Sequence, residues 1–214
     1  MESKTIKLED LYFDPNNYRL RSSPNYQYVD KKMEIKEAIQ NRTKVFISGD
    51  SNFNINELIE SFKTNGLLKV DNILVRLAEG YSDKYIVIEG NRRLAAIKAL
   101  KDLYDNAFDI GIFDPNLFTE GIEVILYSYT NEMEYLVLMG LKHVSGNKKW
   151  DTYNQAKLLN EFKEKGISTE EIAKKIGLRK SEVEKQIRGY LASQNFIEET
   201  NKENYGGKFN AYDK

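Results

Sequence analysis

The segment YIVIEGNRRLAAIKALKDL, which begins at Tyr85, constrains the fold most. Its residues before Gly90 are rich in β-branched and aromatic side chains and predict a strand. The residues after Gly90 place Leu94, Ile97 and Leu100 at helical spacing. A strand therefore passes almost directly into a helix, and we expect an α+β fold.

Elements on either side of this segment extend the pattern. Residues 55–65 have the three-and-four apolar spacing of a helix with one buried face, and Gly66 stands where a C-terminal cap belongs. Residues 72–78 and 84–90 predict two strands of a hairpin, because turn residues separate them. The same periodicities predict a strand within 5–13, a helical stretch over 29–41, a strand over 122–129 and a helix over 132–143.

The Gly90 turn has the composition of an anion-binding site. Backbone N–H groups at the start of a helix attract negative charge, and a glycine lets a ligand approach the main chain closely. Arg92 and Arg93 add two guanidinium groups, which match phosphate oxygens through paired hydrogen bonds. The alternative is that these arginines are solvated or pair with Glu89. Because adjacent arginines at a helix N-terminus oppose the helix dipole, an anionic ligand or a carboxylate would stabilise them.

The order of these motifs resembles the N-terminal domain of ParB-type proteins, which have the ParB/sulfiredoxin fold. The resemblance rests on the helix that ends in Gly66-Leu67-Leu68, on the next strand and EGNRRLAA, and on the opening segment IKLEDLYFDPNNYRL. It extends over residues 5–195 and implies a mixed-sheet domain that binds a nucleoside triphosphate, CTP or ATP. Mg²⁺ bound by carboxylate or amide oxygens stays open as a further ligand. The nucleotide-binding residues that the resemblance implies are Gly66, Leu67, Gly90, Asn91, Arg92 and Arg93.

Two departures limit what the resemblance implies. Sulfiredoxin has a reactive cysteine in the turn where this chain has Asn91, so sulfiredoxin activity is excluded. Asn91 also replaces the glutamate of the family's GERR motif, and Lys69-Val70 replaces its Gln-Pro. Phosphate binding remains the expectation, whereas the identity of the nucleotide and its hydrolysis stay open.

A polar turn between two predicted helices follows His143. Its hydrogen-bonding groups suit phosphate, and we expect it to form the second wall of the pocket through Ser145, Gly146, Asn147 and Lys148. His143 is the chain's single histidine and is either a catalytic candidate, together with Glu89, or a structural hydrogen-bonding group. The catalytic residues remain unknown. With one histidine and no cysteine, no His- or Cys-based metal site is expected.

The segment TEEIAKKIGLRKSEVEKQIR has the spacing of a helix-turn-helix. Ala173 is small where two helices would cross, Gly177 suits a left-handed turn, and Ser168 with Glu171 forms a capping box. The second helix would begin near Lys180 and enter the major groove of DNA. The expected DNA-binding residues are Arg179, Lys180, Ser181, Lys185 and Arg188. The alternative is a helical hairpin used for protein contacts.

These motifs divide the chain into three expected parts. A nucleotide-pocket domain covers 1–148, an all-α helix-turn-helix domain covers 149–197, and a flexible tail covers 198–214. The net charge of −1 gives no global attraction to nucleic acid, so DNA binding must come from local basic patches and would be weak for one copy. We therefore expect a homodimer. No apolar run is long enough for a membrane span and no signal peptide is evident, which favours the cytoplasm.

Three functions remain open at this point. The first is a ParB-like DNA-binding protein in plasmid or chromosome partition or related regulation, with the nucleotide triphosphate acting as a conformational or dimerisation switch. The second is an enzyme on the same fold, such as a weak NTPase, a phosphotransferase or a nuclease. The third is a plain transcriptional regulator with a vestigial pocket. Because no paired-carboxylate motif with metal spacing stands out, the first is favoured, followed by the third.

Overall fold

The computed structural model describes residues 2–21, 23, 25–49, 55–68, 72–128, 132–146 and 150–209. Its contacts divide the chain into two compact units, Met1–Ser128 and Tyr129–Lys214. The sequence placed the division near residue 148 instead. The difference arises because helix α5 (Glu132–His143) packs against α6 (Thr152–Glu164) and α7 (Thr169–Ile176), the helices that follow it.

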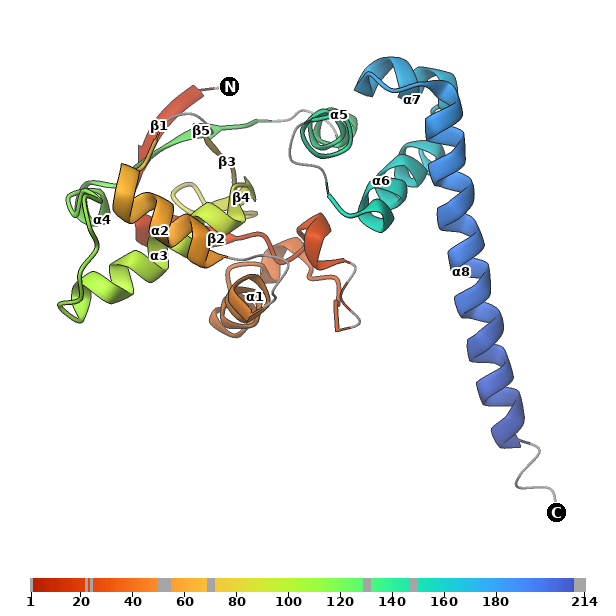
Figure 1. Ribbon diagram of the computed structural model, residues 1–214, viewed down its shortest axis with the longest axis horizontal. Coiled ribbons are helices and arrows are strands. Elements are labelled where there is room, and N and C mark those ends of the chain that lie inside the picture. The colour runs from red at the N-terminus through yellow and green to blue at the C-terminus, as the bar shows by residue number, and fades with distance from the viewer. Residues whose placement is uncertain are drawn as a thin grey trace. The chain divides into compact units, whose positions relative to one another are not determined.

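A five-stranded mixed sheet forms the centre of the first unit (Figure 1). Its strands are β1 (Glu2–Ile6), β2 (Leu11–Phe13), β3 (Ile73–Leu77), β4 (Tyr85–Glu89) and β5 (Ile122–Leu126), in the order β1-β5-β3-β4-β2. The pairs β1–β5 and β3–β4 are antiparallel, whereas β3–β5 and β2–β4 are parallel. The expected α+β class and the β3–β4 hairpin are therefore confirmed.

The N-terminal segment differs from the single strand expected within residues 5–13. It forms two strands, which lie at opposite edges of the sheet and are separated by a 3-10 helix over Leu8–Asp10. Leu8 and Leu11 are both buried, so the alternation that suggested one strand reflects side chains that enter the core from a chain that changes direction. The sequence periodicity therefore indicates which side chains are buried, but it does not indicate at which edge of the sheet each strand lies.

The helical stretch expected over 29–41 is also displaced. Residues Lys31–Met33 form a 3-10 helix, whose start is capped by the Asp30 side chain, and the α-helix α1 covers Glu37–Gly49. Between them Glu34 is buried and bonded to an arginine of β3. This tertiary bond holds the residues before α1 outside the helix, which sequence periodicity could not indicate.

Helix α3 (Asn91–Asp105) packs on the sheet and contacts both α1 and α2 (Ile55–Asn65), so it is the central helix of its layer (Figure 1). The expected bounds of α2 are confirmed. Leu94, Ile97 and Leu100 of α3 are fully buried in the core. Burial of each such side chain contributes about 1.5–3 kcal/mol, which anchors the start of α3 against the sheet. A short helix, α4 (Leu117–Glu120), precedes β5.

The described part of the second unit consists of helices and the turns that join them. Helices α5, α6 and α7 are followed by α8 (Lys180–Phe209), and α8 packs on α6 and α7. A Cβ atom at Gly140 would lie 2.6 Å from Ile176 Cγ2, so glycine permits the close approach of α5 and α7. The tail expected from residue 198 is helical as far as Phe209. In the described part of the chain, no helix has both the length and the apolar character that crossing a bilayer requires.

Candidate functional site

The Gly90 turn joins β4 to α3 as the sequence predicts. Gly90 has a φ of 103°, a left-handed conformation that favours glycine, and its carbonyl accepts the N–H of Leu94 at 2.9 Å. A Cβ atom here would lie 3.1 Å from Ile73 Cγ1. The turn is therefore tight against β3, and the first N–H groups of α3 lie at the end of the sheet where β4 stops and β3 starts.

Asn91 has a structural task in this turn. Its side chain is buried, its Oδ1 accepts the N–H of Asp14 at 3.0 Å, and its Nδ2 donates to the carbonyl of Val87 at 2.7 Å. The amide thus connects the residue after β2 to β4. The side chain of Asn91 is committed to the protein, so a ligand at this residue would be bound by the main chain.

Arg92 and Arg93 lie in the first turn of α3 and are both partly buried. Burial lowers the pKa of Arg92, with the nearby Glu57 acting in the opposite direction. Arg93 Nη2 lies 3.4 Å from Glu89 Oε1. Glu89, a catalytic candidate from the sequence, is therefore an ion-pair partner of Arg93. Pairing of these arginines with Glu89 was the alternative to phosphate binding in the sequence analysis.

A cavity of about 280 Å³ lies beside this turn, within the first unit. Two of the residues expected to contact a nucleotide, Leu67 and Arg93, line this cavity. The other four expected residues in this unit do not line it: Gly66, Gly90, Asn91 and Arg92. Gly66 ends α2 with a φ of 69° and precedes the cavity wall. The other lining residues come from the ends of β1, β3, α4 and β5 and from the loop after α2: Thr5, Leu68, Asn72, Ile73, Leu117, Glu120, Gly121, Ile122 and Glu123.

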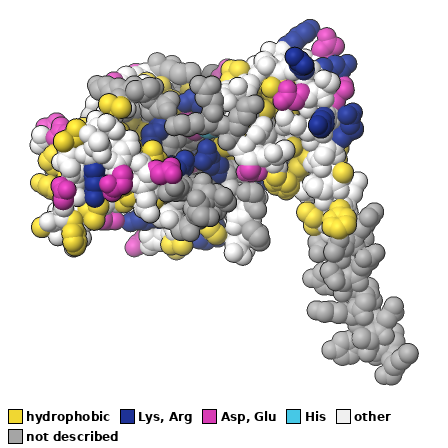
Figure 2. Space-filling model, in the orientation of Figure 1, with side chains coloured by type: hydrophobic (Ala, Val, Ile, Leu, Met, Phe, Trp, Pro, Cys, Tyr) yellow, Lys and Arg dark blue, Asp and Glu magenta, His cyan; other side chains and the backbone are white. Residues whose placement is uncertain are grey.

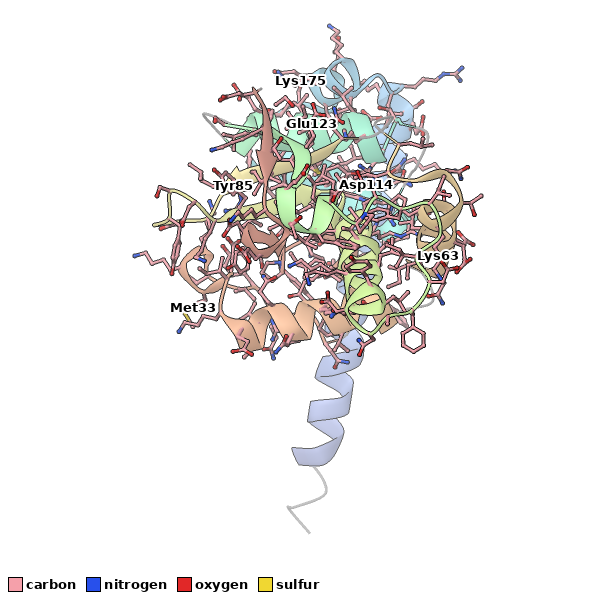
Figure 3. The ribbon with its side chains drawn as sticks, turned by 90° about the vertical axis from the view of Figure 1, so that its left-hand side faces the viewer. Met33, Lys63, Tyr85, Asp114, Glu123 and Lys175 are labelled. Carbon is pink, nitrogen blue, oxygen red and sulfur yellow. The ribbon has the colours of Figure 1, made fainter. Side chains whose placement is uncertain are left out.

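The cavity combines an apolar wall with groups of both charges. Arg93 supplies the guanidinium, whereas Glu120 and Glu123 supply carboxylates (Glu123 is labelled in Figure 3). Glu123 Oε1 also accepts the hydroxyl of Ser3 at 2.8 Å. Mostly apolar clefts with a few polar groups are typical of small-molecule sites, and this one is at the small end of their range. An anionic ligand would be favoured only at the Arg93 end.

A buried charged cluster that the sequence did not indicate supports the same end of α3. Arg76 Nη2 lies 2.6 Å from both carboxylate oxygens of Glu34. Asp14 is buried near Arg76, and burial raises the pKa of both carboxyls, with Arg76 opposing that effect. Asn16 connects the two acids, since its N–H donates to Asp14 Oδ1 at 2.8 Å and its Nδ2 lies 3.4 Å from Glu34 Oε1. The only sequence signal was the turn-rich segment that contains Asp14 and Asn16.

The turn after α5 belongs to the second unit. His143 is buried and its ring stacks on Trp150, with centroids 4.4 Å apart and planes inclined by 9°. This contact favours the structural interpretation of His143 over a catalytic one. Ser145 and Gly146 follow α5, and the Ser145 hydroxyl lies 3.4 Å from the carbonyl of Leu141. Asn147 and Lys148 lie outside the described residues.

Helices α7 and α8 of the second unit have the local geometry expected for the 168–190 segment. Ser168 Oγ accepts the N–H of Glu171 at 3.2 Å, and Gly177 ends α7 with a φ of 70°. Ile172, Ile176, Val183 and Ile187 are buried, whereas Leu178 is half-buried. All five expected DNA-binding residues are exposed: Arg179, Lys180, Ser181, Lys185 and Arg188.

Basic and acidic side chains occur together on this part of the surface (Figure 2). Lys180 Nζ lies 4.0 Å from Glu184 Oε1, and Lys174 and Lys175 pair with Glu170 and Glu171 across one helical turn. Exposed pairs of this kind contribute little to stability and leave the lysines accessible. Within the described residues, no cluster of three or more His, Cys, Asp or Glu side chains could hold a metal ion.

Comparisons with known proteins bear on the first unit. The family model for the ParB N-terminal domain matches residues 20–103. Two solved structures are distantly similar, both of the C-terminally truncated chromosome-partitioning protein ParB from Caulobacter crescentus. The one complexed to the centromeric parS site has 15% identity and a TM-score of 0.42, and covers 91% of this chain and 79% of that chain. The one complexed with CTP-gamma-S has 16% identity and a TM-score of 0.37, and covers 88% and 78%.

No curated protein matches the chain. The family match contains α2, the β3–β4 hairpin, the Gly90 turn and most of α3. These are the elements on which the resemblance to ParB-type proteins rested, and that expectation is confirmed for this part of the chain. Residues 20–103 are thus similar to the ParB N-terminal domain.

Proposed function

We propose that this chain is a ParB-like DNA-binding protein whose first unit binds a nucleoside triphosphate as a switch, in partition or related DNA maintenance. The main observation behind this proposal is that Arg93, at the N-terminus of α3, lines the cavity together with Leu67. A helix N-terminus, a guanidinium and an adjoining cavity form a combination suited to a phosphorylated ligand. The ParB N-terminal domain match supports the same assignment.

In this proposal the phosphates bind at the Gly90 end and the base lies in the cavity. Main-chain N–H groups of the turn and the side chains of Arg92 and Arg93 contact the phosphates, while Leu67 and the apolar wall contact the base. Glu120 and Glu123 can accept hydrogen bonds from an exocyclic amino group, which cytosine and adenine both carry. CTP and ATP are therefore the nucleotides to test, each with and without Mg²⁺.

The second unit binds duplex DNA as a helix-turn-helix in the same proposal. The start of α8 enters the major groove, Arg179, Lys180 and Ser181 contact phosphates or bases, and Lys185 and Arg188 contact the backbone. The mixed charge of this surface makes binding by one copy weak, so two copies engage one site as a homodimer. The polar turn with Ser145, Gly146, Asn147 and Lys148 remains a predicted phosphate-binding segment.

Isothermal titration calorimetry of the intact chain with CTP and ATP tests the nucleotide site, and phosphate release tests turnover. Arg93→Ala should weaken nucleotide binding by roughly tenfold or more, because one charge-assisted contact is lost. The matched control is Arg188→Ala, which removes an exposed arginine from the other unit and should leave nucleotide affinity unchanged. Equal nucleotide affinity of wild type and Arg93→Ala would contradict the proposed site.

The DNA site is tested with the same variants in the opposite sense. Lys185→Ala and Arg188→Ala should each weaken binding of duplex DNA, and each should reduce the slope of log K against log salt by about 1 if it removes one phosphate contact. Arg93→Ala should retain DNA binding without nucleotide. Turnover that is independent of DNA would instead indicate an enzyme, and DNA binding that is indifferent to every nucleotide would indicate a plain regulator.

A further inference from the structure

The loop between α3 and α4 displays large apolar side chains. Phe108 is 63% exposed and Ile112 is 68% exposed, and Tyr104, one turn before Phe108 on α3, is 49% exposed. In Figure 2, hydrophobic side chains reach the surface at the left-hand margin of the first unit, the side on which α3 ends in Figure 1. Large exposed apolar groups gathered in one short stretch of the chain are a mark of interaction surfaces.

This loop is held in one conformation by its own bonds. The N–H of Ile112 donates to the carbonyl of Lys63 in α2 at 2.8 Å, and the N–H of Gly111 donates to Asp109 Oδ1 at 2.9 Å. Gly111 has a φ of 61°, and a Cβ atom there would collide with the backbone of Lys63. The loop can therefore keep Phe108 and Ile112 exposed without collapse onto the core.

Two buried side chains of the same loop anchor it to the core. Ile110 and Phe113 alternate with the exposed residues and enter the core. The Phe113 ring lies 5.3 Å from the Phe118 ring and 6.1 Å from the Phe62 ring, measured between centroids. A loop whose backbone is already held in place loses less conformational entropy on binding, which favours a docking function over chance exposure.

The loop itself carries negative charge, and Lys63, which lies beside it in α2, is paired with Glu60 at 3.7 Å. No lysine or arginine occurs from Asp102 to Glu123, whereas Asp105, Asp109 and Asp114 are exposed (Asp114 is labelled in Figure 3). Lys101 pairs with Asp105 at 2.6 Å, which leaves Asp109 and Asp114 as the acidic groups nearest in sequence to Phe108 and Ile112. A partner that covers the apolar side chains would therefore meet carboxylates beside them.

We propose that Tyr104, Phe108 and Ile112, with Asp109 and Asp114, form a docking surface for a basic amphipathic segment of a partner protein. The apolar face of that segment covers the three exposed side chains, and its Lys or Arg residues face the two carboxylates. Charge complementarity selects this occupant. A second copy that docked through the same surface would place carboxylates opposite carboxylates, which is unfavourable.

A labelled helical peptide of leucine and lysine is the probe, and fluorescence anisotropy with the full chain is the measurement. It should bind the wild type and bind the double variant Phe108→Ser, Ile112→Ser about tenfold or more weakly. Asp109→Asn, which removes the charge but keeps an Oδ1 acceptor for the Gly111 N–H, should also weaken it. Peptides with glutamate in place of lysine, or glutamine in place of leucine, should not bind. The matched control is Tyr28→Ser with Val45→Ser, which removes apolar side chains that are 67% and 68% exposed elsewhere in the same unit.

Three results would overturn the proposal. The first is absence of binding of the leucine–lysine peptide to the wild type. The second is equal binding to the double variant and to the control variant. The third comes from sedimentation velocity of the chain alone: self-association that the double variant abolishes would make a second copy the occupant. Because all substituted residues are exposed, circular dichroism should show that every variant is folded.

Discussion

Replacement of Asn91 by alanine should destabilise the first unit strongly, although the residue lies in a turn. The buried amide accepts the N–H of Asp14 at 3.0 Å and donates to the carbonyl of Val87 at 2.7 Å. Alanine removes both bonds and leaves two buried backbone groups without the partner they have now. Each such group costs about 1–3 kcal/mol, so we expect the free energy of unfolding to fall by about 2–6 kcal/mol.

Urea unfolding followed by far-ultraviolet circular dichroism measures this loss, with Asn106→Ala as the matched control. Asn106 Nδ2 also donates to a carbonyl four residues earlier at 2.7 Å, but that bond, to Asp102, is exposed. Water can replace it, so the control should change the free energy of unfolding by less than about 0.5 kcal/mol. If Asn91→Ala were no more destabilising than Asn106→Ala, the two buried hydrogen bonds of Asn91 would not be what stabilises the turn.

Three further outcomes follow from the same unit. Arg76→Ala should lower the free energy of unfolding by about 3–5 kcal/mol, because it leaves the buried Glu34 carboxylate without its guanidinium, and Glu34→Gln in that background should recover part of the loss in urea unfolding. Burial lowers the pKa of Lys98 from 10.5 to about 8, so between these values the unfolded chain holds a proton that the folded chain has lost. Unfolding curves measured from about pH 8 to 10.5 should therefore show wild type gaining stability relative to Lys98→Met as the pH rises. Gly111→Ala should lower the melting temperature more than Gly80→Ala, since both have positive φ but only Gly111 meets the backbone of another element.

The sequence predicted the elements whose signals are local. The bounds of α2, the hairpin of β3 and β4 and the start of α3 follow from periodicity and from Gly66 and Gly90. The edge strands β1 and β2 and the start of α1 did not follow, because strand partners far along the chain and the Glu34–Arg76 bond determine them. Long-range pairing leaves no periodic trace in a single sequence.

The candidate site was predictable only in part. The sequence indicated Arg93 and Leu67, and the cavity brings them together. The sequence also assigned Asn91 to the ligand, whereas in the structure its side chain bonds the backbone of Asp14 and Val87. A short amide at a helix start can bond either a ligand or the nearby backbone, and the sequence alone does not distinguish the two. The acidic rim of the cavity, Glu120 with Glu123, could not be predicted because α4 and β5 reach it through the fold.

The arrangement of β1 and β2 has a consequence for synthesis on the ribosome. β2 can pair as soon as β4 has emerged, but β1 pairs with β5 (Ile122–Leu126), the last strand of the unit to be made. The residues of β1 must therefore wait for their partner strand until nearly the whole unit has left the exit tunnel. An open edge at that stage is a site for misassembly between neighbouring nascent chains, so slow translation before β5 should favour aggregation.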